Sequence, residues 1–441
     1  MSQPSPDFNA RERLRKNAPD ERCIVNSDCV SDIHQAYDAL AAWCRVRSYA
    51  GYDPFDGLNS RLFQATPLKR SRLARLAWTQ LFKRSPVNLR RLARVPVERN
   101  SKGTALFALA ALADFRRHKT KEAERHARAL LDDLLAARVK GEWHGAAWGY
   151  NFDWQGRAFF APKNTPTIVP TAFAARAFVE AARTFDDDEY LSIARGTCEF
   201  ILHDLRRSAE SFEEKRAEVC WSYSPLDTTR VYNASLLAAE TLASVAALTG
   251  EAELREWAER GARYVVRGQR ADGSWAYGAD SYQSWADNFH TAFVLTSLSR
   301  IIESCGEACR DEIVGAARRG YDFWRASFFL ADGWPKYYHD KLYPADAHSV
   351  GASIIALLEL RWLDANAPAF AEQIARWAVR ELYDERGFFY YQRRRFYKVR
   401  TPYMRWSEAW MLYALARLLE EAPDITTHRS ADAGSGLTVD G

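Results

Sequence analysis

The feature that most restricts the fold of this 441-residue chain is an internal repeat. Each copy reads as a helix, a turn with Gly and an aromatic residue, an aromatic and polar loop, and a second helix. The most regular copy starts at Arg260, continues through Asp272-Gly273 and Trp275, and leads into an apolar helix after His290. Such units cannot bury their own apolar faces, so successive copies must pack on one another.

The helices of the repeat fall into two alternating classes. Those after the aromatic loops are small and apolar all round, as in the segment after Asn233, and fit an inner ring. Those before the loops are amphipathic and fit an outer ring. We therefore predict an all-α fold, an α/α toroid of about six hairpins in a single domain over residues 31–422. Helices expected at 31–47, 66–83, 102–117 and 120–138 complete the ring. Residues 1–30 are predicted to be a polar segment and 423–441 a disordered tail.

Composition excludes several classes of function. The formal net charge is only +4, which gives no broad basic footprint for nucleic acid. Seven cysteines in spacings that match no zinc pattern suggest free thiols, and the N-terminus shows no apolar signal segment. We expect a cytoplasmic protein without a metal or other cofactor. The basic stretch 69–94 is interpreted as a solvated helix face or as a contact with an anionic surface such as a lipid membrane.

Two resemblances add to this interpretation. The segment from Arg260 to Trp275, with Gln269, resembles the QW repeat of squalene and hopene cyclases and of related prenyltransferase-fold proteins. The strings at 52–60, 83–90, 100–103, 221–225, 232–234 and 287–291 resemble a family of toroid proteins encoded in bacterial polysaccharide-biosynthesis loci, over roughly residues 40 to 420. This second resemblance implies a role in making a surface polysaccharide or exopolysaccharide.

A toroid gathers the N-termini of its inner helices, and the loops before them, at one end of the ring. Helix N-termini favour anions and carboxylates there. Candidate catalytic residues at this end are Asp153, Asp287, His290, Asp346, His348 and Glu408. An acid near a histidine recurs in Asp287/His290 and Asp346/His348, as general acid–base catalysis needs. The alternative is structural: Asn233, Asp287 and Asp346 suit N-caps, and each histidine suits a satisfied core position.

Aromatic and polar residues in the same loops are typical of a sugar-binding surface, because pyranose CH faces stack on rings while hydroxyls need polar partners. The candidate substrate-binding residues are Trp154, Tyr223, Arg230, Asn233, Tyr277, Tyr282, Trp285, Asn288, Tyr337 and Arg405. For Trp221, Trp275 and Trp334 we favour wedge packing between repeats instead.

These observations predict a carbohydrate-active protein, and most simply an enzyme, that binds an oligo- or polysaccharide, with a lipid-linked glycan as one form of the substrate. Glycoside hydrolysis would use two carboxylates across the scissile bond. A lyase or uronate epimerase would use a base and an acid, with a cation at the substrate carboxylate. The sequence leaves both chemistries open, as it does the oligomeric state. The alternatives are a non-catalytic glycan-binding or scaffold protein and an isoprenoid enzyme that resembles the terpenoid cyclases.

Overall fold

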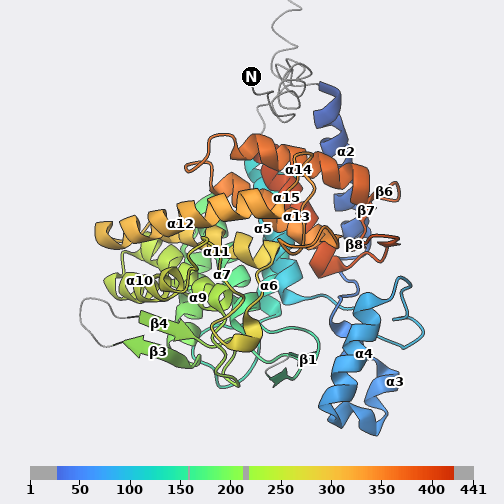
Figure 1. Cartoon of the computed structure of the whole chain (residues 1–441), viewed down its shortest axis with the longest axis horizontal. Coiled ribbons are helices and arrows are strands. Elements are labelled where there is room, and N and C mark those ends of the chain that lie inside the picture. Colours follow the sequence, from blue (N-terminus) through green and yellow to red (C-terminus); the bar gives the residue numbers. More distant parts are fainter. Residues whose placement is uncertain (1–26, 157–158, 212–217, 422–441) are drawn as a thin grey trace, which may run out of the picture.

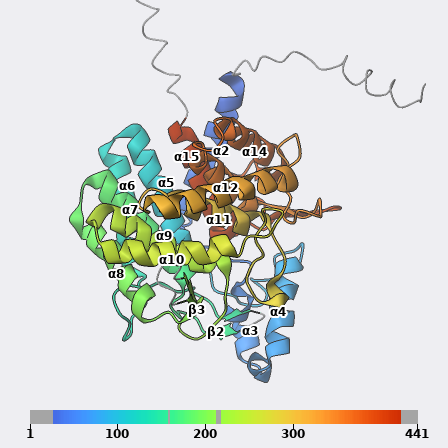
Figure 2. The ribbon, with the colours of Figure 1, turned by 60° about the vertical axis from the view of Figure 1, so that its left-hand side comes forward.

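The computed structural model describes residues 27–156, 159–211 and 218–421, which form a closed ring of paired helices (Figures 1 and 2). Each inner helix contacts the next, and the last contacts the first, so the ring closes. This confirms the predicted α/α toroid. The inner helices are α5 (Ser101–His118), α7 (Ile168–Phe185), α9 (Tyr232–Thr249), α11 (Asn288–Ile301), α13 (Ala347–Glu359) and α15 (Ala409–Glu421). The outer helices are α2 (Ser27–Val46), α6 (Lys121–Ala136), α8 (Asp188–His203), α10 (Ala252–Arg267), α12 (Glu307–Phe328) and α14 (Ala367–Leu382).

Each aromatic loop leads from an outer helix to the following inner helix and packs against the next outer helix along the chain. Trp275 is buried, and its Nε1 donates to the carbonyl oxygen of Val265 at 2.8 Å. Its ring lies on Gly320 of α12, where an added Cβ would come within 2.3 Å of the indole. Gln269 donates to the carbonyl oxygen of Ala316, also on α12, at 2.9 Å. Glycine is needed on α12 because the indole occupies the space of a side chain.

Trp221 and Trp334 have the same role as Trp275. Both are buried, and Trp221 lies on Gly261 of α10. The Trp334 ring packs edge-on against Trp377 of α14, with the ring centroids 5.2 Å apart. The structure thus agrees with wedge packing for all three tryptophans.

Short strands pair within and between the loops. The antiparallel pairs are β1 (Trp154–Gln155) with β2 (Phe160–Ala161), β3 (Arg207–Ser211) with β4 (Glu218–Trp221), and β6 (Tyr383–Asp384) with β7 (Phe388–Phe389). A three-stranded sheet has the order β5 (Ala345–Asp346), β8 (Gln392–Arg393) and β9 (Lys398–Val399). The loop before α11 also contains a short 3-10 helix, η3 (Ser281–Gln283).

A small lobe precedes the first complete hairpin and lies beside the ring (Figure 1). It contains η1 (Asp56–Asn59), α3 (Arg61–Gln64), η2 (Pro67–Arg70) and α4 (Arg72–Arg84). The helix predicted at 66–83 is present from Arg72 onward as α4, but its first part is a separate 3-10 helix after Thr66; the N-cap Ser71 of α4 accepts a hydrogen bond from the Ala74 N–H. Pro and Ser at these positions start a new helix.

Buried Arg90 fastens this lobe to the ring. Its guanidinium donates to Asp56 at 2.6 Å, to the Tyr403 hydroxyl at 2.8 Å and to the Asp53 carbonyl oxygen at 2.7 Å. Tyr403 belongs to the last hairpin, so this contact joins residues 313 positions apart. The lobe is held by satisfied, charge-assisted hydrogen bonds.

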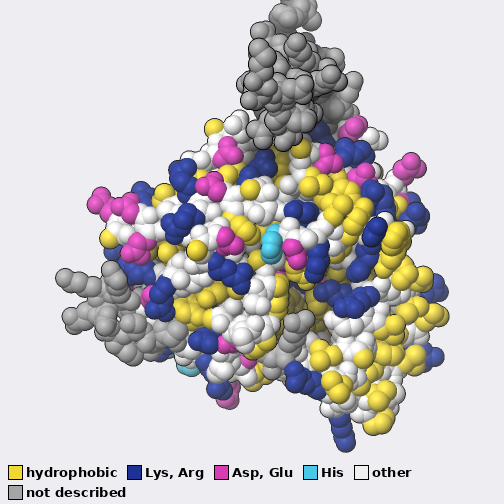
Figure 3. Space-filling model, in the orientation of Figure 1, with side chains coloured by type: hydrophobic (Ala, Val, Ile, Leu, Met, Phe, Trp, Pro, Cys, Tyr) yellow, Lys and Arg dark blue, Asp and Glu magenta, His cyan; other side chains and the backbone are white. Residues whose placement is uncertain are grey.

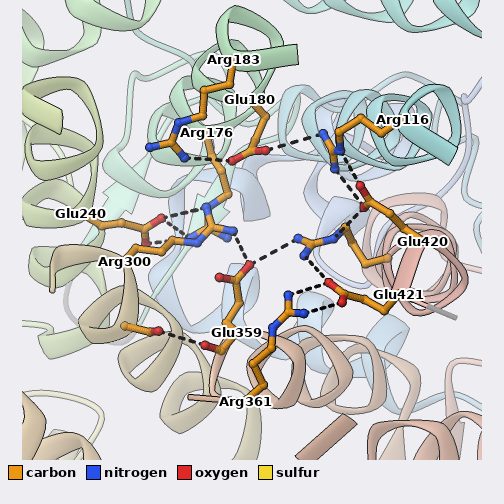
Figure 4. A network of polar contacts seen from close by, with 12 residues as sticks. Arg116, Arg176, Glu180, Arg183, Glu240, Arg300, Glu359, Arg361, Glu420 and Glu421 are labelled. Atoms are coloured by element: carbon orange, nitrogen blue, oxygen red, sulfur yellow. Dashed lines mark hydrogen bonds and ion pairs between the residues drawn. The ribbon is translucent and has the colours of Figure 1, made fainter. Parts of the chain in front are cut away.

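The C-terminal ends of the inner helices meet in a network of ion pairs (Figure 4). The network surrounds a polar cavity of about 210 Å³. Arg116 and Arg300 lie in the last turn of their helices, where a cation interacts favourably with the helix dipole, and glutamates from neighbouring helices neutralise the arginines. The network takes at least one charged residue from every inner helix: Arg116, Arg176, Glu240, Arg300, Glu359, Arg417 and Glu420.

The predicted domain limits, at 31 and 422, stay a prediction. Helix α2 starts at Ser27, a few residues before the predicted start of the toroid at 31. Residues 1–26 and the tail 423–441 lie outside the described residues. Over the described ranges, no helix combines the length and the apolar character that crossing a membrane requires.

Candidate active site

Aromatic side chains from separate hairpins meet at the N-terminal ends of the inner helices. Trp154 packs against Tyr223, with ring centroids 5.0 Å apart, and the Tyr223 hydroxyl lies 3.2 Å from that of Tyr150. The Arg405 guanidinium lies 5.3 Å from the Tyr150 ring centroid, and Trp406 comes directly after it in the chain. One side of the cluster therefore joins the loops before α7 and α9 to the start of the last inner helix.

On the other side of the cluster, a chain of ring contacts leads from Trp406 to the loop before α11. The His348 ring lies 4.2 Å from Trp406 and 4.5 Å from Phe289, centroid to centroid. Phe289 in turn lies 4.0 Å from His290, and His290 lies 4.7 Å from Tyr277. These contacts bring together side chains from opposite ends of the ring-forming sequence.

Four side chains of the cluster are only partly buried. Tyr150, Tyr277, Tyr337 and His290 keep part of their surface exposed although each is enclosed by neighbouring elements. Burial is the main reason that the pKa of each of the three tyrosines is raised, so their hydroxyls stay protonated donors at neutral pH. Rings and hydroxyls alternate here as they do in sugar-binding surfaces.

Asp287 and His290 form a hydrogen-bonded pair at the start of α11. Asp287 is the N-cap residue: its Oδ1 accepts from the His290 backbone N–H at 3.0 Å, and its Oδ2 lies 2.7 Å from His290 Nδ1. A carboxylate only accepts, so Nδ1 carries a proton, and in the neutral imidazole Nε2 keeps its lone pair. Trp285 Nε1 donates to the same carboxylate at 3.2 Å, and its ring stacks on Tyr277 at 4.7 Å. Capping and orientation of the histidine, which the sequence offers as alternatives, occur together.

The sequence predicts an equivalent pair of His348 with Asp346, but the structure separates these two side chains. Asp346 caps α13 through the Ser349 N–H at 2.8 Å, and His348 is only two residues beyond it. Residues two apart on a helix point to different sides, whereas the three-residue spacing of Asp287 and His290 brings the side chains together. Asp346 is fully buried, and its Oδ2 accepts from Trp406 Nε1 and from Gln392 Nε2, each at 3.4 Å. It acts on the cluster by positioning Trp406.

The imidazole of His348 is buried, yet neither ring nitrogen has a hydrogen-bond partner in the protein. Burial, and next the charges of Lys102 and Arg405, lower the pKa of His348 well below its usual value, so the ring is neutral near pH 7. Buried polar groups are normally paired, and an unpaired one needs an explanation. A substrate hydroxyl or carbonyl group would supply the missing partner.

Three basic residues lie at the same end. Arg405 makes a bidentate pair with Asp53, with N–O distances of 2.6 and 2.8 Å. Lys102, at the start of α5, points its ammonium at the ring of Phe173, 4.4 Å from the centroid. Lys83 of α4 lies 4.5 Å from the Phe55 ring centroid. Neither lysine is among the sequence-predicted site residues, because a lysine in a basic stretch or in an apolar helix gives no local sign of what it faces.

The turn before α15 sets the direction of several of these side chains. Residues Met404–Glu408 form a π-helical turn, η4, which inserts an extra residue and rotates the helix after it. Arg405 and Trp406 therefore face the cluster. Glu408, predicted as catalytic, points the other way: it accepts from the Phe389 N–H at 2.9 Å near the outer helix α2. Burial raises its pKa well above the usual value.

Five further predicted residues have other positions. Asp153 accepts from the Lys163 N–H, and Asn288 makes hydrogen bonds with Trp324 and Ser353 inside the helix packing. Arg230 pairs with Asp280 on a loop, and Tyr282 on the same loop is exposed. Asn233 is not the predicted cap, because Val231 is the N-cap residue and Asn233 is the second residue of α9.

Asn233 is nevertheless buried at the predicted end of the ring, and its Oδ1 has no partner in the protein. Within the described ranges, no three His, Cys, Asp or Glu side chains are close enough together to hold a metal ion.

Comparison with known proteins gives the fold and no family. No family model and no curated sequence matches the chain. Among solved structures, the chain is similar to an unsaturated glucuronyl hydrolase specific for heparin, with 14% identity, a TM-score of 0.57, and coverage of 90% of this chain and 98% of that one.

Two other solved structures show that several chemistries use this fold. Cellobiose 2-epimerase from Bacillus thermoamylovorans is 12% identical, with a TM-score of 0.55, over 74% of this chain and 90% of that one. A D-mannose isomerase is 13% identical, with a TM-score of 0.53, over 74% and 87%. At these identities the likeness is one of fold, and the α/α toroid is shared by all three.

Proposed function

We propose that this protein is a glycan-modifying enzyme that moves a proton at a sugar carbon next to a carbonyl or carboxyl group. The observation that carries the proposal is the pair of imidazoles, His290 and His348, that both contact the Phe289 ring. Asp287 orients His290 and leaves its Nε2 free as a base, and His348 is neutral with both nitrogens unpaired. Two such groups suit removal of a proton from one face of a carbon and its return to the other.

The charges and rings around the pair suit a sugar, and in particular an acidic one. Lys83 lies beside Trp406, which contacts His348, and supplies the positive charge that a uronate carboxylate would require, whereas the charge of Arg405 beside the same ring is paired with Asp53. Tyr277 and Trp154 offer faces for stacking.

The similar structures support a carbohydrate substrate. They include a hydrolase, an epimerase and an isomerase, all named for sugars or glycans. Among these chemistries, the histidine pair favours that of an epimerase or a lyase. The substrate that we propose is a glycan of surface-polysaccharide biosynthesis, either free or lipid-linked.

Glycoside hydrolysis is the second candidate, and it rests on Asp346. Burial raises the pKa of this carboxyl group, as a general acid requires. Its oxygens are occupied by Ser349, Gln392 and Trp406, however, whereas both ring nitrogens of His348 are without a partner. Asp346 is therefore less available to a substrate than His348, and we favour proton transfer by the histidines.

The test is hydrogen exchange at carbon. The protein is incubated in D₂O with uronate-containing oligosaccharides and with reducing disaccharides, and deuterium incorporation is followed by NMR. We expect incorporation with the wild-type chain and a loss of roughly 10²–10⁴-fold for Asp287→Asn and for His348→Phe. Asp287→Asn keeps the acceptor for the helix cap but reverses the tautomer in which His290 is held.

The chain offers a matched control. His144 and Asp204 form a similar pair, with Nδ1 and Oδ1 3.0 Å apart, at the surface. Asp204→Asn should leave exchange unchanged. Wild-type protein that releases new reducing ends with neither deuterium at carbon nor an unsaturated sugar in the product would show hydrolysis instead, whereas an unsaturated product would show the lyase reaction. Glycan binding without any of these reactions would show a non-catalytic binder, and the proposal would be wrong in the case of hydrolysis or of binding alone.

A further inference from the structure

The small lobe carries a concentration of positive charge. Residues 57–97, here called the basic lobe, contain ten Lys and Arg and no Asp or Glu. The whole chain has a net charge of +4, so the other residues together carry −6. Three of the ten face the protein: Arg90 is buried against Asp56, Arg75 donates to Gln155, and Lys83 lies on the Phe55 ring. Seven others are exposed: Arg61, Lys69, Arg70, Arg72, Arg84, Arg91 and Arg94.

The same lobe exposes large aliphatic side chains. Leu73 and Leu92 are 78% and 76% exposed, which is close to full exposure. On α4, Leu73, Ala77 and Leu81 recur every four residues and form one solvent-facing stripe. Figure 3 shows hydrophobic side chains interspersed with Lys and Arg over this part of the molecule. The exposed aliphatic residues of the basic lobe are Leu62, Leu68, Leu73, Leu81, Val87, Leu92 and Val97.

We propose that the basic lobe docks on an anionic lipid membrane. Exposed leucines enter the boundary between headgroups and acyl chains, while arginine side chains extend to the lipid phosphates. Each basic residue near an anionic bilayer adds to binding, and the negative charge on the rest of the chain turns this lobe toward the surface. The proposal does not depend on the reaction proposed above.

Charge argues against a second copy of the chain as the occupant of this surface. A twofold interface would place the same patch on both sides, and each side would bring at least seven exposed positive charges against seven. Such an arrangement costs free energy that a few leucines do not offset. A lipid surface supplies both the negative charge and the apolar depth that the lobe lacks.

The test uses the full-length chain and vesicles of phosphatidylcholine, alone or with phosphatidylglycerol, in a sedimentation assay. We expect binding to the anionic vesicles, weaker binding to phosphatidylcholine, and loss of binding as salt is raised. The variant Arg70→Glu/Arg84→Glu/Arg91→Glu should weaken the partition coefficient by more than about tenfold. These side chains are exposed, so the fold should survive, which circular dichroism checks.

The matched control changes the same number of charges elsewhere. Arg125, Arg255 and Arg318 are exposed on outer helices, and their triple substitution by Glu gives the same net charge. The control should bind vesicles as the wild type does, apart from a small general effect. Equal losses in both triple variants, or wild-type binding that is equal for both vesicle types, would overturn the proposal.

The apolar part is tested separately. Leu73→Ser/Leu92→Ser should weaken binding to anionic vesicles by about tenfold or more at fixed charge. Leu248→Ser/Leu330→Ser, at exposed positions outside the lobe, should not. Ultracentrifugation of the free protein provides a second check: a dimer that Leu73→Ser/Leu92→Ser dissolves would assign the surface to a second copy and overturn the membrane assignment.

Discussion

The ion pair of Arg176 and Glu240 allows a quantitative test of how the ion-pair network stabilises the ring. Both side chains are about 95% buried, and the guanidinium makes three contacts with the carboxylate at 2.6 to 2.9 Å (Figure 4). The carboxylate also accepts from Ser297 at 2.6 Å and lies 3.5 Å from Arg300. The pair links α7 to α9, and Arg300 extends the link to α11.

The structure predicts unequal costs for the two single variants. Glu240→Leu leaves the guanidinium of Arg176 buried without a carboxylate, which should cost about 3–5 kcal/mol. Arg176→Met leaves Glu240 with Ser297 and Arg300, so the cost should be lower, about 1–3 kcal/mol. The double variant replaces both charges with apolar groups of similar volume and removes both penalties. We expect it to be at least about 2 kcal/mol more stable than the sum of the single effects implies.

Urea unfolding followed by tryptophan fluorescence measures these differences, with Glu124→Ala as the control. Glu124 pairs with Arg128 on α6, where both side chains are more than a third exposed, and its loss should cost less than about 0.5 kcal/mol. Additive single effects, within about 0.5 kcal/mol, would refute the view that the buried pair acts as a unit.

The pH dependence of stability gives a second test of the same pair. Burial alone would raise the pKa of Glu240, but Arg176 and then Arg300 hold it below the usual value of 4.5. A carboxylate with a depressed pKa stabilises the fold above its unfolded-state pKa, and this contribution is lost as the pH falls through the folded-state value. The wild type should therefore lose more stability than the double variant when the pH is lowered below about 4.5.

Two other predictions concern the site and the packing. Burial lowers the pKa of Lys83 to about 8, so substrate binding that needs its charge should weaken as the pH rises through about 8. The variant Lys83→Met should bind substrate more weakly at pH 7 and should lose this pH dependence. Measurement of KM as a function of pH tests both expectations. Gly320→Ala should destabilise the fold by about 1–3 kcal/mol because the new Cβ meets the Trp275 indole. Gly315→Ala on the same helix has only the Arg319 side chain nearby, at 3.5 Å, and should be neutral or stabilising by up to about 1 kcal/mol; a loss for Gly315 as large as for Gly320 would contradict the packing argument.

The ring could be predicted from the sequence because its cause is local. The Trp-bearing loops, the glycines on which Trp221 and Trp275 pack, and the small apolar inner helices specify hairpins that have to close. The end of the ring that holds the site is set by the same repeat. Asp287 and His290 could be found as well, since three residues separate them and the Asp is a strong N-cap residue.

The rest of the site depends on contacts between distant segments. Asp53 meets Arg405 across 352 residues, and no periodicity signals that pairing. The direction of Glu408 depends on the π-helical turn, which a 3.6-residue period cannot show. The predicted pairing of Asp346 with His348 rests on proximity in sequence alone, but a spacing of two sends their side chains apart.

Helix α4 takes part in both proposals, because one of its faces contacts the candidate active site and the opposite face belongs to the proposed membrane-binding surface. Lys83 points inward, with its ammonium 5.9 Å from the Trp406 ring centroid, and the adjacent Arg84 is exposed to solvent, as are Leu73 and Leu81 on the same helix. Neighbouring substitutions should therefore separate the two properties. Lys83→Met should weaken substrate binding and leave vesicle binding intact, whereas Arg84→Glu should weaken vesicle binding and leave turnover of a soluble oligosaccharide intact. Loss of both properties in either variant would mean that α4 is simply a structural support whose disturbance reaches every function of the chain.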